Sequence, residues 1–226
     1  EILGFDIILN NIIGQSKITS LGGDIHIDKY IGNLSIFAIG GILKSNNISG
    51  EHSNFQISGK ILEVKNANTN LTLSNKTGDI LLEKVIGKIN IDTDTGSVDI
   101  KDSSGELIVN TINGDISFED ISGSTDTKSV RGSISLRLNY DSSFQNTYHS
   151  IQTIHGDINT EIPKNLSVSL SSQIDFIRST QDITSQIPLE FIMKDDKIIG
   201  EALINGGFIP IILFSKNGFI SVKTIN

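Results

Sequence analysis

Glycine recurs at a fixed spacing of nine residues along most of this chain. The first series is Gly14, Gly23, Gly32, Gly41, Gly50 and Gly59. The second series is Gly78, Gly87, Gly96, Gly105, Gly114, Gly123 and Gly132, and the step from Gly59 to Gly78 equals two periods plus one inserted residue. A fixed period of this kind predicts a repeat protein, in which each short unit buries its apolar side only by stacking on its neighbours.

Apolar and polar residues alternate after the glycines of the second series. The residues two positions after glycine include Ile80, Ile89, Val98, Leu107, Ile116 and Ile134, and those four positions after include Leu82, Ile91, Ile100, Val109, Phe118 and Leu136. In the unit that begins at Gly123, Thr125 and Thr127 take these two positions. An alternation of period two indicates a strand with one buried face. Each unit therefore predicts a five-residue strand and a four-residue turn that contains the glycine.

Two such units are needed to enclose a core, because a nine-residue unit supplies only one strand. The predicted coil has 18 residues, so residues 18 apart should lie on neighbouring strands, about 4.8 Å from each other. Three columns are predicted: inward Leu82, Ile100, Phe118 and Leu136; outward Glu83, Lys101, Glu119 and Arg137; and a hydroxyl column of Thr93, Thr111 and Ser129. The outward column alternates in charge, as directly opposed side chains on neighbouring strands favour.

The predicted fold class is all-β, a right-handed parallel β-helix or β-roll solenoid with about 18 residues per coil. Isoleucine is abundant whereas alanine and methionine are scarce, which favours strands over helices. We expect one domain over residues 1–226, with an N-terminal cap strand in 1–20, regular nonapeptide repeats in 21–138, and less regular coils with a C-terminal cap in 139–226. Cross-sections with two sheets and with three sheets both remain open, and so does the role of residues 171–200.

Composition excludes some functions. The net charge of −8 argues against nucleic acid as a partner, because phosphate backbones attract basic surfaces. The absence of cysteine excludes disulfides, thiolate nucleophiles and cysteine-ligated metals. No apolar run reaches the roughly 18 residues of a membrane span, although the chain starts at Glu1, so that a signal or anchor upstream of this segment stays open.

Several motifs resemble the repeats of the bacterial DUF4097 family, also described as adhesin repeats. These are Thr77-Gly78-Asp79-Ile80-Leu81-Leu82, Asn113-Gly114-Asp115-Ile116-Ser117-Phe118 and His155-Gly156-Asp157-Ile158. The strand at 162–168 and the closing segment at 206–222 also resemble that family, and the resemblance covers roughly residues 20–226. It implies a β-solenoid in an extracytoplasmic or membrane-tethered bacterial protein, and it supplies no catalytic residues to carry over.

Few residues stand out as candidates for chemistry, and we expect no catalytic, cofactor-binding or metal site. Asp102 and Asp120 are 18 residues apart and should stack, as the paired carboxylates of a glycosidase would require. His149 and His155 could form a metal site with Asp157. The plainer interpretations are a solvated column of turn carboxylates and surface histidines. No unit carries the full calcium-binding nonapeptide pattern, so the aspartates of the Gly-Asp turns are expected to accept turn hydrogen bonds.

These features predict a non-enzymatic surface or envelope module in the periplasm or at the cell surface of a bacterium, an adhesin-like solenoid for adhesion or assembly. Its expected partner is an envelope or surface component, either protein or glycan, and no cofactor is expected. Two alternatives remain: a carbohydrate-active β-helix enzyme (lyase or hydrolase), and a structural protein that associates with itself through its end strands.

Overall fold

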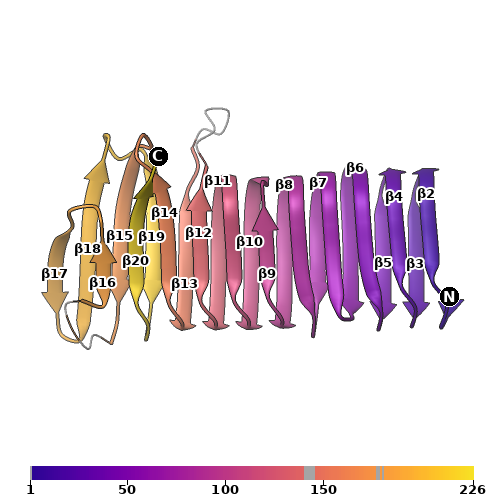
Figure 1. The fold of residues 1–226 in the computed structure, drawn as a ribbon, viewed down its shortest axis with the longest axis horizontal. Coiled ribbons are helices and arrows are strands. Elements are labelled where there is room, and N and C mark those ends of the chain that lie inside the picture. The colour runs from indigo at the N-terminus through magenta and orange to yellow at the C-terminus, as the bar shows by residue number, and fades with distance from the viewer. Residues whose placement is uncertain (1, 140–145, 177–178, 180) are drawn as a thin grey trace.

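The computed structural model describes residues 2–139, 146–176, 179 and 181–226. Figure 1 shows these residues as a rod of stacked strands, with the N-terminus at one end. The described residues form strands and turns without a helix, and the strands wind into parallel stacked coils of about 18 residues. The predicted β-solenoid is therefore confirmed. No helix in these ranges has the length and apolar character to cross a membrane.

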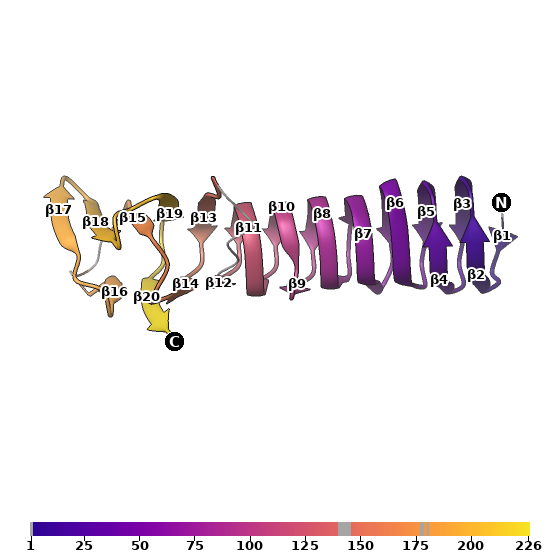
Figure 2. The same ribbon diagram turned by 90° about the horizontal axis from the view of Figure 1, so that it is seen from above.

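Each coil contributes one arm to each of two faces of the rod, and four long strands run through both faces (Figures 1 and 2). These long strands are β6 (Ile42–Ser58), β7 (Ile61–Asn75), β8 (Asp79–Thr95) and β11 (Ile116–Arg131). Face 1 takes their first halves together with β2 (Ile7–Ile13), β4 (Ile25–Ile31), β9 (Val98–Lys101), β12 (Ile134–Leu138), β14 (Ile158–Pro163), β20 (Ile220–Ile225) and β16 (Ile183–Ser185). Face 2 takes their second halves together with β1 (Ile2–Leu3), β3 (Ser16–Leu21), β5 (Leu34–Ile39), β10 (Ser104–Asn113), β13 (His149–His155), β19 (Ile209–Ser215), β15 (Val168–Ile174), β18 (Lys197–Ile204) and β17 (Glu190–Lys194).

Residues one period apart lie opposite one another on neighbouring strands, as the glycine spacing predicts. Leu82 is opposite Ile100, Ile100 is opposite Phe118, and Phe118 is opposite Leu136. The hydroxyl column is also confirmed, since Thr111 lies between Thr93 and Ser129. The same register reaches back to β1, where Ile2 is opposite Ser20.

Among the coils from β2 to β14, two hold more than 18 residues. In one, Leu34 is opposite Ser53 and not His52, so this coil holds one extra residue, and the register shifts between Ser49 and His52. The inserted residue therefore lies at that corner and not between Gly59 and Gly78, as the glycine spacing alone suggested. In the other long coil, Ile134 is opposite Ile158 and not Gln152, and the additional chain includes residues 140–145, which lie outside the described residues.

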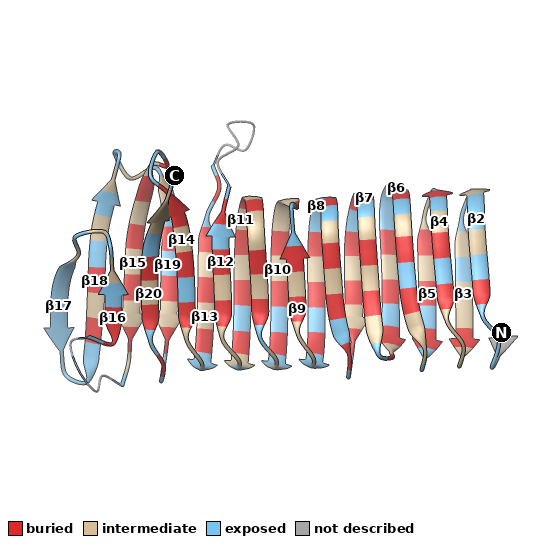
Figure 3. Cartoon of the chain, in the orientation of Figure 1, coloured by how far each residue is buried: buried red, intermediate tan, exposed pale blue. Residues whose placement is uncertain are grey.

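Buried and exposed residues form stripes across the rod in Figure 3. On face 1 the alternation skips one position in the coils up to β11: for example, Glu83 and Lys84 both face outward, and Val85 is fully buried. Lys84 has a φ of 56°, and Asn47, Asn66, Asp102 and Asp120 at the same corner of other coils also have positive φ. A left-handed residue turns the strand here, which explains why asparagine and aspartate, the residues that tolerate this conformation, are common at this corner.

The glycines of both series stand where successive turns approach most closely. A Cβ added to Gly114 would lie 1.9 Å from the carbonyl oxygen of Gly96, and one added to Gly123 would lie 2.1 Å from that of Gly105. Only glycine permits this stacking of one turn on the next. The nine-residue spacing thus records two columns of close backbone contact, one at each of two corners of the coil.

The last coil in the sequence is not the last coil in the rod. β19 and β20 lie between the coil of β13 and β14 on one side and β15 and β16 on the other. Beyond β15 the parallel order ends, because β18 pairs antiparallel with β15 and β17 pairs antiparallel with β18. Residues 183–204 therefore close this end with short strands and a hairpin.

Candidate binding groove

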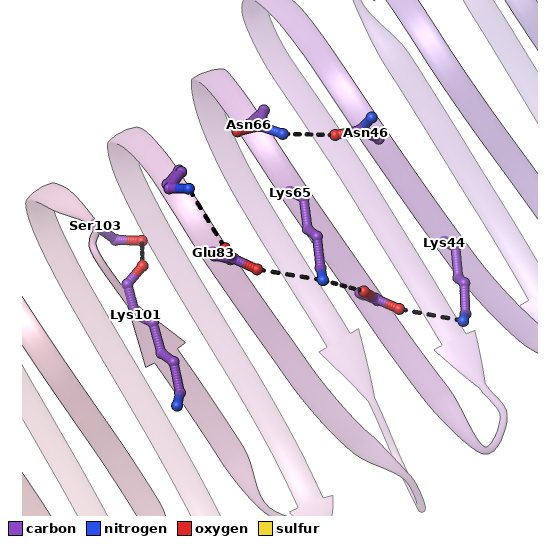
Figure 4. A network of polar contacts seen from close by, with 9 residues as sticks. Lys44, Asn46, Lys65, Asn66, Glu83, Lys101 and Ser103 are labelled. Carbon is purple, nitrogen blue, oxygen red and sulfur yellow. Dashed lines mark hydrogen bonds and ion pairs between the residues drawn. The ribbon is translucent and has the colours of Figure 1, made fainter.

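The predicted charge column on face 1 exists and is longer than the sequence suggested. Successive opposed residues are Lys65, Glu83, Lys101, Glu119, Arg137, Glu161 and Lys223. Figure 4 shows the contact between Lys65 and Glu83, whose charged atoms are 3.2 Å apart. Lys65 also contacts Glu63, at 3.0 Å. Lys101 contacts Glu119 at 2.7 Å, and hydrogen bonding from this lysine lowers the pKa of the Glu119 carboxyl.

This charge column is a structural feature. Its side chains are solvent-exposed and water screens their charges, so each pair adds little to the stability of the fold. The charges compensate one another along the rod, which leaves face 1 without a concentrated field of either sign.

The aspartates of the Gly-Asp turns link neighbouring coils, which confirms the predicted hydrogen-bonding role. Asp79 accepts a hydrogen bond from the backbone N–H of Ser97 at 2.8 Å, and Asp115 accepts one from Ser133 at 2.7 Å. Asp157 does the same with the N–H of Phe219 at 2.9 Å. Each bond ties a turn to the coil that stacks on it. The Gly-Asp pair of the repeat motif thus has a packing role at glycine and a linking role at aspartate.

Asp102 and Asp120 lie at the left-handed corner of face 1, on successive coils. Their φ values of 48° and 55° account for the presence of aspartate at this corner. Asp120 contacts the guanidinium of Arg137 at 3.3 Å. Neither residue lines the groove described below. The column is therefore a set of turn carboxylates with partial charge compensation.

The histidine candidates lie in different environments. His149 is buried on β13, where its Nδ1 lies 3.1 Å from the hydroxyl of Thr125 on the coil before it. Burial lowers the pKa of His149 to about 4, so its ring is neutral at pH 7. His155, at the end of the same strand, is exposed, and Asp157 is engaged in the turn. Within the described ranges, no group of three or more His, Cys, Asp or Glu residues is arranged to hold a metal ion.

His149 also pairs with one of the two buried threonines of this region. Thr125 and Thr127 take inward positions and are fully buried, and Thr125 lies opposite His149. The imidazole supplies a hydrogen-bond partner for the threonine hydroxyl at a depth where an unpaired polar group would be costly. Thr125, which breaks the apolar alternation in the sequence, is thus complementary to a histidine on the next coil.

A groove of about 480 Å³ on the outer side of face 2 is a candidate for ligand binding. It crosses β8, β10, β11, β13 and β19, so it spans four strand spacings, or about 19 Å. One side is a row of opposed outward residues: Asp92, Asn110, Lys128, Gln152 and Phe214. The other side is a row of Asp94, Ile112, Val130 and Ile154.

The two rows of the groove differ in chemistry. Asn110 donates a hydrogen bond to Asp92 at 3.0 Å, which orients an amide and a carboxylate at one end. Lys128 is exposed in the middle and has no ion pair with any described residue. Ile112 and Ile154 expose 47% and 37% of their surface, large fractions for isoleucines on a regular sheet. A polar row beside an apolar row can bind an extended chain that carries both kinds of group.

Sequence reasoning did not single out this groove. The spacing of 18 residues places Asp92, Asn110 and Lys128 in one outward column, so part of the polar row was available. The places of Gln152 and Phe214 in the row could not be predicted, because Gln152 follows the long coil and Phe214 belongs to the displaced last coil.

Comparisons of the chain with protein-family models, with curated proteins and with solved structures gave no match. The resemblance to the DUF4097 family therefore stays a prediction.

Proposed function

We propose that this chain is a non-enzymatic extracytoplasmic module, a rigid rod that binds a component of a cell surface or envelope through the groove on face 2. The observation that carries the proposal is the pairing of the polar row Asp92, Asn110, Lys128 and Gln152 with the apolar row Ile112, Val130 and Ile154 across four strands. The regular coils beneath it hold both rows at fixed spacing. An extended ligand would meet a preformed surface and would not need to order it.

The shape and chemistry of the groove favour a polymer over a small molecule. The groove extends over five strands, about 19 Å along the rod, whereas sites for small molecules usually enclose most of a compact ligand. Carboxylate, amide and ammonium groups can hydrogen-bond hydroxyl or amide groups of a repeating chain, and the isoleucines and Phe214 can pack against its apolar faces.

Binding arrays test this proposal. The probes are bacterial envelope polysaccharides, peptidoglycan fragments and immobilised envelope proteins, presented to the chain and to two groove variants, Lys128→Glu and Ile112→Asp. We expect at least one probe to bind the chain and to lose about tenfold or more in affinity with either variant, because each removes a central groove contact. The control is Lys76→Glu, the same charge change at an exposed turn outside the groove. Equal binding by the groove variants would move the site elsewhere, and no binding to any probe would refute the proposal.

One observation favours the carbohydrate-active alternative enough to test it with the same probes. Asp92 and Asp94 both line the groove, and a pair of carboxylates is what most glycosidases use. Under the proposed function, incubation with polysaccharides yields no new reducing ends or unsaturated products. Cleavage that disappears in Asp92→Asn or Asp94→Asn would establish the enzyme instead.

A further inference from the structure

β17 (Glu190–Lys194) is the outermost strand at the end of the rod opposite the N-terminus (Figures 1 and 2). Among the described strands it pairs only with β18, so its other edge leaves backbone N–H and C=O groups free to pair. All five of its side chains are exposed, including Phe191, Ile192 and Met193, at 49%, 52% and 57%. Natural edge strands usually avoid such a run of apolar residues, because it invites pairing with another chain.

Like charges oppose each other at both ends of the hairpin formed by β17 and β18. Glu190 lies opposite Glu201, and Lys194 lies opposite Lys197. Directly opposed like charges on neighbouring strands are unfavourable. Lys197 has a partner in Asp175 at 3.2 Å, but neither Glu190 nor Lys194 has an ion pair with a described residue. Within one copy, Glu190 and Lys194 thus each lie opposite a like charge on β18 and form no ion pair with a described residue.

The sequence of β17 is complementary to itself when two copies run antiparallel. With Ile192 opposite Ile192 of a second copy, Glu190 falls opposite Lys194, Lys194 falls opposite Glu190, and Phe191 falls opposite Met193. Both charges that lack a partner in one copy gain one of opposite sign, and the three apolar residues become contiguous with their counterparts. We propose that β17 is a dimerisation strand that pairs antiparallel with β17 of a second copy of this chain.

The resulting assembly has a two-fold axis perpendicular to the sheet at Ile192. Such an interface is isologous and closes at two copies. Face 2 of one rod continues into face 2 of the other, so the rods join end to end through their C-terminal hairpins. A second copy is the occupant favoured here because the charge pattern complements itself. This inference does not depend on the groove or on its ligand.

Charge exchange tests the register of the pairing. Glu190→Lys and Lys194→Glu each place like charges opposite one another in the dimer, twice because of the symmetry, and we expect each to weaken association about fivefold or more. The double variant restores opposite charges and should return association to within about twofold of the original chain. Analytical ultracentrifugation over a concentration series measures all four proteins, with Lys76→Glu as the control for a change of net charge.

Small-angle X-ray scattering tests the geometry of the dimer. End-to-end joining should nearly double the maximum dimension of the particle, whereas side-by-side packing would leave it almost unchanged. A chain that is monomeric at all concentrations overturns the proposal, as does a dimer of unchanged length. Association that the single variants do not weaken, or that the double variant does not restore, overturns it as well. Circular dichroism of each variant separates loss of pairing from loss of folding.

Discussion

The stacking of glycine turns yields a sharp prediction from two positions in the same column, Gly14 and Gly32. Both have a positive φ, 139° and 131°, so alanine is conformationally strained at either. A Cβ on Gly32 would lie 1.9 Å from the carbonyl oxygen of Gly14, whereas a Cβ on Gly14 would meet no atom within 4 Å. The two substitutions therefore share the conformational penalty and differ in the clash between coils.

The magnitudes follow from these distances. The strain common to both substitutions is about 1–3 kcal/mol. A carbon and a carbonyl oxygen normally approach to no less than about 3.3 Å, so Gly32→Ala must open the two turns by roughly 1.4 Å. The obstructing atom belongs to the backbone, so no side-chain rotation relieves the contact, and overpacking of this kind adds about 1–3 kcal/mol.

Guanidinium denaturation followed by circular dichroism measures the difference. We expect Gly32→Ala to lose at least about 1 kcal/mol more than Gly14→Ala. Amide hydrogen exchange of β4 and β5 shows whether the loss is local, because the coils of a solenoid can open separately. Equal losses for the two variants would mean that φ alone selects glycine and that close stacking plays no part.

Three further predictions concern the core, a buried histidine and a corner. Ile116→Ala should cost about 2–5 kcal/mol because the side chain is buried, while Ser117→Ala, which points outward, should cost little; equal costs in denaturation would contradict the assigned faces. The pKa of His149 falls from 6.5 to about 4 on folding, so the neutral ring contributes up to about 3 kcal/mol to the free energy of unfolding. This contribution is complete above pH 6.5 and is lost as the pH falls toward 4. His149→Leu should therefore flatten the pH dependence of stability over that range, and an unchanged profile would contradict the burial of His149. Lys84→Asn should raise the melting temperature through a gain of about 0.5 kcal/mol in stability, because asparagine tolerates a φ of 56° better than lysine. A lower melting temperature would show that the lysine side chain stabilises the fold by more than the strain of its backbone destabilises it.

The repeat could be predicted from the sequence because its signals are local. Gly114 and Ile116 stand two residues apart, and their counterparts in the next coil stand at the same offset, so spacing alone gives the coil, the inward faces and the charge column. The C-terminal arrangement could not be predicted in the same way. His149 lies opposite Ile211, far along the chain, and no periodicity connects them.

The residues of the candidate site also fall into those that the repeat predicts and those that it does not. Asp92, Asn110 and Lys128 obey the period of the coil, whereas Phe214 joins their row only because β19 is inserted beside β13. The chain must pass through β15, β16, β17 and β18 before β19 can take that place. The order in which strands stack, unlike the period of a repeat, is a property of the whole fold.

The groove and the dimerisation strand lie on the same face, and together they predict bivalent binding. β19, the last strand of the groove, is followed along face 2 by β15, β18 and β17. In the dimer, seven strand spacings separate the two copies of β19, or about 34 Å along the shared sheet. Because the two-fold axis is perpendicular to that sheet, both grooves lie on the same side of the sheet. A repeating polymer or a dense surface can therefore occupy both grooves at once. Avidity then strengthens binding to an immobilised ligand without any new contact, and Glu190→Lys should reduce that binding while leaving the affinity for a short soluble fragment unchanged. Equal loss on both forms of the ligand would show that β17 acts on the groove itself and not through the second copy.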